Sequence, residues 1–231
     1  MTAIAPRPVA GHRGRSPSPP GAELTASEAF AAALRGEPCR VTGIGDATML
    51  LPFRRWCADA DAADHELLIR CLDATVDIGC GPGRMTRALL GRGIKALGID
   101  VVPEAVELTR SRGAIALQRD VFATIPGEGR WRTALLADGN IGIGGDPLRL
   151  LRRLGDVLAS GGRIVTDISA PGGPIRVHRI GLEVAGRHTR PFPWAVVPAE
   201  RLEELAEQSS LRILEVVNHE GRWFATLEKP G

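Results

Sequence analysis

The sequence predicts an α/β protein whose mostly parallel sheet lies between two layers of helices. Three observations lead to this prediction. Short apolar segments alternate with amphipathic ones, a glycine-rich turn joins the first such pair, and the chain closes with two strand-like segments. Strands that are buried on both faces are apolar throughout, and their alternation with helices is typical of parallel sheets with crossover connections.

Five short apolar segments are expected to form the parallel strands, and three amphipathic segments the helices between them. The strands are residues 74–78, 96–99, 114–117, 133–137 and 163–166, and the helices are residues 84–90, 103–112 and 147–159. Pro103 and Pro147 suit the first turn of a helix. Residues 211–218 and 222–227 are joined by only three residues, which forces an antiparallel hairpin.

The 231 residues are enough for one well-packed domain and too few for two sizeable ones. Residues 1–22 are rich in Pro, Gly, Ser and Arg, and we expect them to form a disordered tail. A single domain is expected over residues 23–231. Its first part, residues 23–72, is predicted to be an N-terminal helical cap, and residues 169–198 an insertion after the fifth strand.

Composition argues against several classes of partner. The chain has 29 basic and 27 acidic residues, a net charge of +2, which gives no reason to expect nucleic acid or a membrane surface. The four cysteines form no C-x-x-C pair, and no histidine pair has zinc spacing, so we predict no metal site. No apolar run approaches the ~20 residues of a membrane span. We therefore expect a cytoplasmic protein with free thiols, whose oligomeric state stays open.

The most informative segment runs from Val76 to Arg84 and reads V-D-I-G-C-G-P-G-R, between a predicted strand and a predicted helix. Side chains at Gly79, Gly81 and Gly83 would block a ligand that approaches the backbone closely. Dinucleotide enzymes need G-x-G-x-x-G, whereas the spacing here is G-x-G-x-G. Asp77 precedes the first glycine by two residues. Its carboxylate favours a ligand with a positively charged amino group, and S-adenosylmethionine has one.

Two further acids follow the next strands. Asp100 ends the second strand about 20 residues after the glycines, where an acid commonly binds ribose hydroxyls; the alternative is a cap for the following helix. Asp120 and Val121 follow the third strand. Asp120 can accept a hydrogen bond from an adenine amino group while the Val121 backbone meets the ring, and the alternative is a solvated loop aspartate.

From Asp77 to Ser169 the sequence resembles the class I S-adenosylmethionine-dependent methyltransferases. The matching segments are D-x-G-C-G-P-G, G-I-D, R-D-V and L-L-A-D-G-N. The resemblance covers roughly residues 51–228. It implies a Rossmann-like three-layer sandwich, with a seven-stranded, mostly parallel sheet whose last strand is antiparallel. Residues 137–147 are also similar to those of an actinobacterial-like branch.

The resemblance assigns roles to residues around the glycine turn. It places the methionine part on Asp77 and the turn, the ribose on Asp100, and the adenine on Asp120 and Val121. The expected cofactor-binding residues are Asp77, Gly79, Cys80, Gly81, Gly83, Asp100, Val101, Asp120, Val121 and Ala137. The fourth motif, Ala137 to Asn140, would lie beside the methyl group.

The methyl acceptor is expected to be a small molecule, held between the 138–145 loop and the 169–198 insertion. Asp138 and Asn140 are the candidate anchors, and His178 is a candidate base. Arg54 or Arg55 pairs with the methionine carboxylate, or the two arginines are a solvated basic pair. The sequence has no D/N-P-P-Y motif of amino-methylating nucleic-acid enzymes. A non-catalytic binding module, or another chemistry at the same cofactor site, remains an alternative function.

Overall fold

The computed structural model describes residues 23–44 and 49–231. The tail predicted over residues 1–22 lies outside the described residues. Within the described ranges, no helix is long and apolar enough to cross a membrane.

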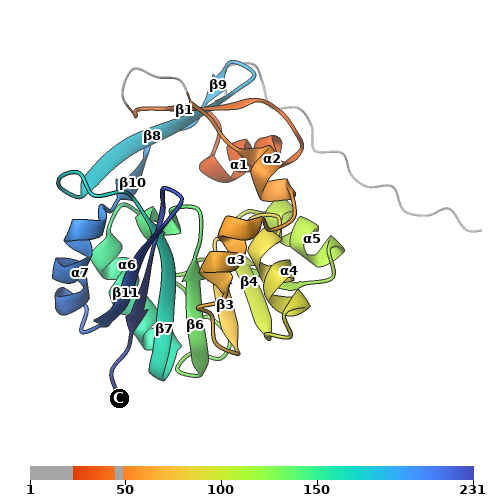
Figure 1. Cartoon of the computed structure of the whole chain (residues 1–231). Coiled ribbons are helices and arrows are strands. Elements are labelled where there is room, and N and C mark those ends of the chain that lie inside the picture. The colour runs from red at the N-terminus through yellow and green to blue at the C-terminus, as the bar shows by residue number, and fades with distance from the viewer. Residues whose placement is uncertain (1–22, 45–48) are drawn as a thin grey trace, which may run out of the picture.

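Seven strands form the main sheet in the order β11-β12-β7-β6-β3-β4-β5 (Figure 1). Their bounds are β3 Thr75–Ile78, β4 Ala96–Asp100, β5 Ile115–Gln118, β6 Trp131–Leu136, β7 Leu158–Ile168, β11 Arg212–His219 and β12 Arg222–Glu228. The five strands from β3 to β7 are parallel, whereas β12 is antiparallel to both of its neighbours. The predicted fold class, the hairpin and the antiparallel last strand are confirmed.

Helices cover both faces of this sheet. The helices are α3 Ala62–Leu68, α4 Arg84–Gly91 and α5 Pro103–Ser111 on one face, and α6 Pro147–Val157 and α7 Leu202–Gln208 on the other (Figure 1). Short 3-10 turns, η1 Asn140–Gly142 and η2 Ala199–Arg201, precede α6 and α7. The central strands are buried on both faces because each packs on a helical layer. This explains why their sequences are apolar throughout.

A second sheet corrects the prediction of a purely helical N-terminal cap. Besides α1 Ala26–Leu34 and α2 Phe53–Cys57, the segment contributes β1 Cys39–Thr42 and β2 Met49–Leu50. These strands join β8 Arg176–Val184, β9 Arg187–His188 and β10 Phe192–Val196 from the insertion. Strand β1 pairs with β8, about 140 residues away in the chain. Strand β1 has only four residues, too few for a clear periodic pattern, and local patterns do not reveal a partner so distant.

The second sheet lies over the carboxyl ends of the main-sheet strands (Figure 1). Two isolated bridges fix it there: Ile143 pairs with Trp194, and Ser169 pairs with Pro198. The cap and the insertion, separate in the sequence prediction, therefore form one structure over this edge. Ligands of open α/β sheets bind at this edge.

Candidate active site

The glycine turn joins the end of β3 to the start of α4 and is bonded to the neighbouring strand. The N–H groups of Gly79 and Cys80 both donate to the carbonyl of Ile99. The turn glycines have φ values of +68°, +53° and +84° at Gly79, Gly81 and Gly83. Residues that carry a Cβ rarely adopt such φ values, so the backbone of the turn explains why glycine occurs at these three positions.

The three glycines are required for different reasons. A Cβ at Gly79 would lie 2.7 Å from the Asn140 Nδ2 atom, and one at Gly83 would lie 2.7 Å from the Thr109 Oγ1 atom. A Cβ at Gly81 would meet no atom within 4 Å. The expectation that a ligand requires all three positions to lack a side chain stays a prediction, to which packing adds a second reason at two positions. Packing already requires two of them, and Gly81 is the one that faces open space.

Asp77 lies beneath the turn and is 1% exposed. The Thr86 hydroxyl donates to its carboxylate at 2.6 Å. Burial raises the pKa of Asp77 to about 7, against an opposing contribution from the Thr86 hydrogen bond. A direct contact with a ligand would need the turn to move, so the charge of Asp77 would act on a ligand through the electrostatic field.

Asp100 connects the second strand to the glycine turn. Its carboxylate accepts hydrogen bonds from the N–H of Gly81 and the N–H of Val102, both at 2.9 Å. Val102 is the N-cap residue of α5, and no side chain caps this helix, so Asp100 is not the helix cap considered as its alternative role. The same carboxylate also positions Gly81. Burial raises the pKa of Asp100. The adjacent Val101 is 52% exposed and offers an apolar surface beside it.

The third predicted segment is less open than expected. The Asp120 carboxylate accepts a hydrogen bond from the N–H of Phe122 at 2.9 Å, and its residue is exposed. Val121 has a buried side chain, and its carbonyl accepts from Arg153 Nε at 2.9 Å. The Val121 carbonyl therefore already accepts a hydrogen bond from within the protein.

The fourth motif turns sharply at the end of β6. Ala137 is buried, and Asp138 has a φ of +53°. Asn140 donates from Nδ2 to the carbonyls of Ile78 at 2.8 Å and Gly79 at 3.1 Å. The Nδ2 side of its amide therefore holds the glycine turn, and an anchoring role of Asn140 toward an acceptor would use its Oδ1 atom.

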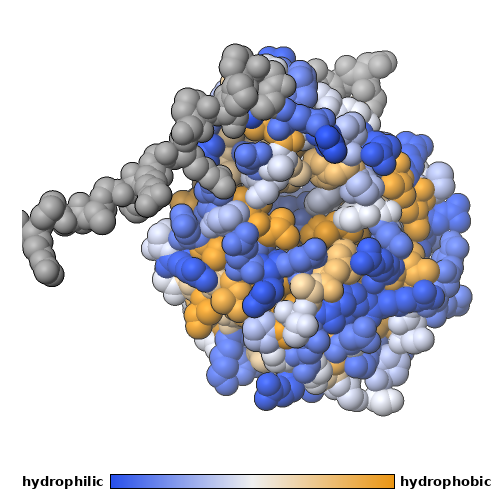
Figure 2. Space-filling model, turned by 180° about the vertical axis from the view of Figure 1, so that it is seen from behind, coloured by the Kyte–Doolittle hydropathy of each residue, from blue (hydrophilic) through white to orange (hydrophobic). Residues whose placement is uncertain are grey.

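A cavity of about 480 Å³ opens beside Asp138. Its apolar wall includes Ile141, Ile168, Trp194, Ala195 and Val197, and its charged lining is Arg55, Asp138, Asp167 and Arg222. Apolar residues gather in the band between the second sheet and the main domain in Figure 2. The cavity lies between the 138–145 loop and the 169–198 insertion, where an acceptor site was predicted.

His178 is not among the residues that line this cavity. It lies on β8, directly opposite Trp194 of β10, and is half-buried. Directly opposite residues of antiparallel strands share a face. His178 therefore shares the face of Trp194 but lies outside the cavity, so a direct role as base would require a further movement.

A network of charged residues, which sequence reasoning missed, surrounds the polar end of the cavity. Asp64 on α3 is fully buried and contacts the guanidinium groups of Arg55, Arg84 and Arg222. Its members come from six segments of the chain: Arg55, Asp61, Asp64, Arg84, Asp138, Asp167 and Arg222. We call this set the charged network. No motif marks it, because its members are close only in the folded chain.

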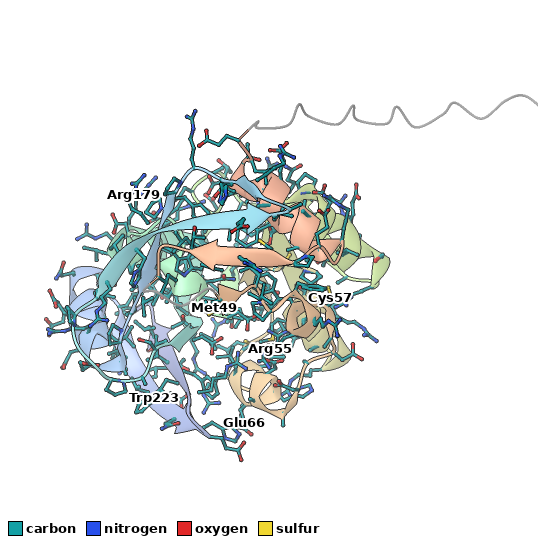
Figure 3. The ribbon with its side chains drawn as sticks, turned by 90° about the horizontal axis from the view of Figure 1, so that it is seen from above. Met49, Arg55, Cys57, Glu66, Arg179 and Trp223 are labelled. Carbon is teal, nitrogen blue, oxygen red and sulfur yellow. The ribbon has the colours of Figure 1, made fainter. Side chains whose placement is uncertain are left out.

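Arg55 belongs to this network, although its side chain is 40% exposed. It contacts Asp61 and Asp64, and its Nε lies 3.9 Å from an Asp138 oxygen. Seen from above, Arg55 on α2 lies between Cys57 and Glu66, and Trp223 of β12 lies to the left of it (Figure 3). Of the two arginines considered for a methionine carboxylate, only Arg55 lines the cavity.

The described residues contain no group of three or more His, Cys, Asp or Glu that could hold a metal ion. The four cysteines, Cys39, Cys57, Cys71 and Cys80, are free. Burial raises the pKa of Cys80, the cysteine of the glycine turn. This thiol is therefore a packing group at neutral pH and a poor nucleophile.

Comparison with known proteins connects this geometry to a protein class. Residues 75–162 match the family described as "Methyltransferase domain". A probable cobalt-precorrin-6B C(15)-methyltransferase (decarboxylating) of Methanothermobacter thermautotrophicus is 34% identical over 118 residues, 45% of this chain and 59% of that protein. Trans-aconitate 2-methyltransferase of Paracidovorax citrulli is 33% identical over 118 residues, 48% of this chain and 45% of that protein. The chain thus spans about half the length of these curated relatives.

Solved structures share the fold over most of the chain. An S-adenosylmethionine-dependent methyltransferase from Bacteroides fragilis, in complex with S-adenosyl-L-homocysteine, has a TM-score of 0.75 at 19% identity. The match covers 89% of this chain and 94% of that one. A Burkholderia thailandensis 1,6-didemethyltoxoflavin-N1-methyltransferase matches with a TM-score of 0.58 at 18% identity, over 83% and 96% of the two chains. Residues 75–162 are thus similar to a methyltransferase domain, and the chain shares its fold with solved S-adenosylmethionine-dependent methyltransferases.

Proposed function

We propose that the protein binds S-adenosylmethionine at the glycine turn and transfers its methyl group to a small molecule held in the cavity beside Asp138. One observation carries the proposal: the glycine turn, with Gly81 and Asp100, and the cavity both adjoin the fourth motif. Asn140 bonds to the glycine turn, and Asp138, two residues earlier, lines the cavity. A donor and an acceptor bound at these two places would therefore be neighbours.

The residues of the turn fit such a cofactor. Gly81 leaves the backbone open, and the Asp100 carboxylate keeps lone pairs beyond its two backbone hydrogen bonds for ribose hydroxyls. Val101 offers apolar surface for a base. S-adenosylmethionine, when bound, supplies an electrophilic methyl group on a sulfonium.

The cavity would align the acceptor for an in-line displacement. Its apolar wall would bind the body of the acceptor, and Asp138, whose side chain is 27% exposed, would accept a hydrogen bond from an attacking hydroxyl or amine. Much of the rate enhancement can come from this alignment alone. A proton acceptor is needed only where the attacking group is weakly acidic, so His178 is not required.

Several features support a small acceptor over a polymer. The cavity is enclosed on one side by β10 of the second sheet, and its guanidinium groups are paired with carboxylates. A nucleic-acid track needs cations that are free to meet phosphates. The four free cysteines suit a reducing compartment, so we place the activity in the cytoplasm. We also propose the relation to an actinobacterial-like branch, from residues 137–147.

Binding and turnover test this function separately. Calorimetry should show binding of S-adenosylhomocysteine and no binding of NAD, because the glycine spacing does not suit a pyrophosphate. S-adenosylhomocysteine should then form from S-adenosylmethionine in the presence of small alcohols or amines. Binding of NAD without a response to either sulfur ligand would contradict the proposed cofactor. Tight cofactor binding with no turnover across a broad acceptor panel would indicate a non-catalytic binding module.

A further inference from the structure

Asp138 is held in an unusual backbone conformation by the neighbouring strand. Its φ of +53° lies in the left-handed region, which a non-glycine residue adopts only when its surroundings compensate. The Asp138 N–H donates to the Asp167 Oδ2 atom at 2.6 Å. Asp167 lies near the carboxyl end of β7, so β7 fixes where the Asp138 backbone lies.

Asp167 is oriented in turn by the C-terminal hairpin. Arg222, the first residue of β12, donates from Nε to Asp167 Oδ1 at 2.7 Å and from Nη2 to Asp167 Oδ2 at 2.8 Å. This pair of parallel hydrogen bonds fixes the plane of the carboxylate as well as its position. The other edge of the guanidinium donates from Nη1 to Asp64 Oδ1 at 2.7 Å. The guanidinium also lies over the Phe224 ring, 5.5 Å from its centre.

We propose that Arg222 is a positioning residue for Asp138, and that it acts through Asp167. The inference rests on the proposed function, in which Asp138 lies beside the transferred methyl group. Arg222, Asp167 and Asp138 all line the cavity. The hairpin at the end of the chain therefore sets the shape of the polar end of the acceptor site.

The geometry separates this role from that of a simple ion pair. One oxygen, Asp167 Oδ2, accepts from both Arg222 Nη2 and the Asp138 N–H. A rotation of the carboxylate would therefore move the backbone of Asp138. Lysine supplies the same charge but cannot hold both carboxylate oxygens in a fixed plane. An Arg222→Lys variant keeps the positive charge, so we expect it to fold. Because the paired hydrogen bonds are lost, we expect the Asp138 backbone to move.

The test compares Arg222→Lys with Arg212→Lys. Arg212 pairs with Glu228 between the same two strands, far from the cavity and 67% exposed, so it is a matched control. Spectra of protein labelled with ¹⁵N-aspartate report the Asp138 amide, whose proton should resonate downfield because a carboxylate accepts it. Calorimetry measures the affinity for S-adenosylhomocysteine, and thermal melting measures stability.

We expect Arg222→Lys to move the Asp138 amide proton upfield and, with an acceptor found in the turnover screen, to lower kcat by about tenfold, the loss typical of one misplaced charge-assisted hydrogen bond. Its affinity for S-adenosylhomocysteine should stay largely unchanged, because the cofactor is held at the glycine turn. Asp167→Asn, which keeps an oxygen for the Asp138 N–H, should move the resonance less. Arg212→Lys should change neither quantity. An unmoved Asp138 resonance in Arg222→Lys, or a fall in melting temperature alone, would overturn the positioning role. If the wild-type protein does not bind S-adenosylhomocysteine, the proposed function fails, while the amide resonance still decides the positioning.

Discussion

The cofactor end and the acceptor end of the site are held together by different kinds of contact. At the cofactor end, the glycine turn is shaped by backbone conformation and by N–H groups that donate to Ile99 and Asp100. At the acceptor end, the charged network joins side chains from six segments. A backbone-built site tolerates changes of nearby side chains but not added Cβ atoms. A side-chain network tolerates little loss of its buried members, because removing a charge there leaves a buried partner unpaired.

The acceptor end should show the largest loss of stability. Replacing Asp64 with Asn removes the carboxylate that three guanidinium groups share, one of them the buried Arg84. We expect the free energy of unfolding to fall by about 3 to 5 kcal/mol, as for other buried pairs broken on one side. Chemical denaturation measures it. Asp59→Asn breaks an exposed pair with Arg87 and should change stability little. Equal losses for both variants would show that the network adds no more than a surface pair.

The cofactor end should show the largest loss of binding. A Gly81→Val side chain would enter the open space that we assign to the cofactor, so S-adenosylhomocysteine binding should weaken by about 100-fold or more. Gly113→Val is the matched control, because Gly113 also has a positive φ, +81°, and open space around its Cβ. Both variants carry a similar backbone cost of about 1 to 2 kcal/mol. Calorimetry should find wild-type affinity for S-adenosylhomocysteine in Gly113→Val only. Similar affinities in the two variants would contradict a cofactor site at this turn.

The same contrast explains what the sequence could reveal. The strands, the hairpin and the glycine turn were predictable because each is encoded in consecutive residues, with apolar runs and glycines at fixed spacing. The pairing of β1 with β8 and the contact of Asp64 with Arg222 were not predictable. Both join residues more than 100 positions apart, and local patterns carry no information on such pairs. Asn140 was assigned to the right loop, but its role depends on which carbonyls it reaches.

Asp100 links the turn to the ribose site that we propose. Asp100→Ala should remove charge-assisted hydrogen bonds worth about 1.5 to 3 kcal/mol and weaken S-adenosylhomocysteine binding by about tenfold or more. Loss of its bond to the Gly81 N–H should add to this effect. Asp120→Ala removes an exposed carboxylate that holds only the Phe122 N–H among the bonds described, so its effect should be smaller. An unchanged dissociation constant in Asp100→Ala would leave that residue with only its backbone hydrogen bonds to Gly81 and Val102.

A smaller effect is expected from pH. Burial raises the pKa of Asp77 to about 7, so its ionised form is present above pH 7 and is lost as pH falls through 7. A bound ammonium group nearby would favour the ionised form, and binding should therefore strengthen as pH rises. S-adenosylhomocysteine should bind about threefold to tenfold more tightly at pH 8 than at pH 6. Asp77→Asn should flatten this dependence in calorimetry at both pH values, and a variant with the wild-type slope would assign the dependence to another group.

The most direct measurement is a crystal structure of the protein with S-adenosylhomocysteine. The proposed function predicts the adenosine part over Gly81, with ribose hydroxyls at the Asp100 carboxylate and the base beside Val101. It predicts the sulfur atom facing Asp138, with the 480 Å³ cavity left open beyond it. The shape of that remaining space would define the acceptor. A ligand seated inside the cavity and away from the glycine turn would contradict the division of the site into a cofactor end and an acceptor end.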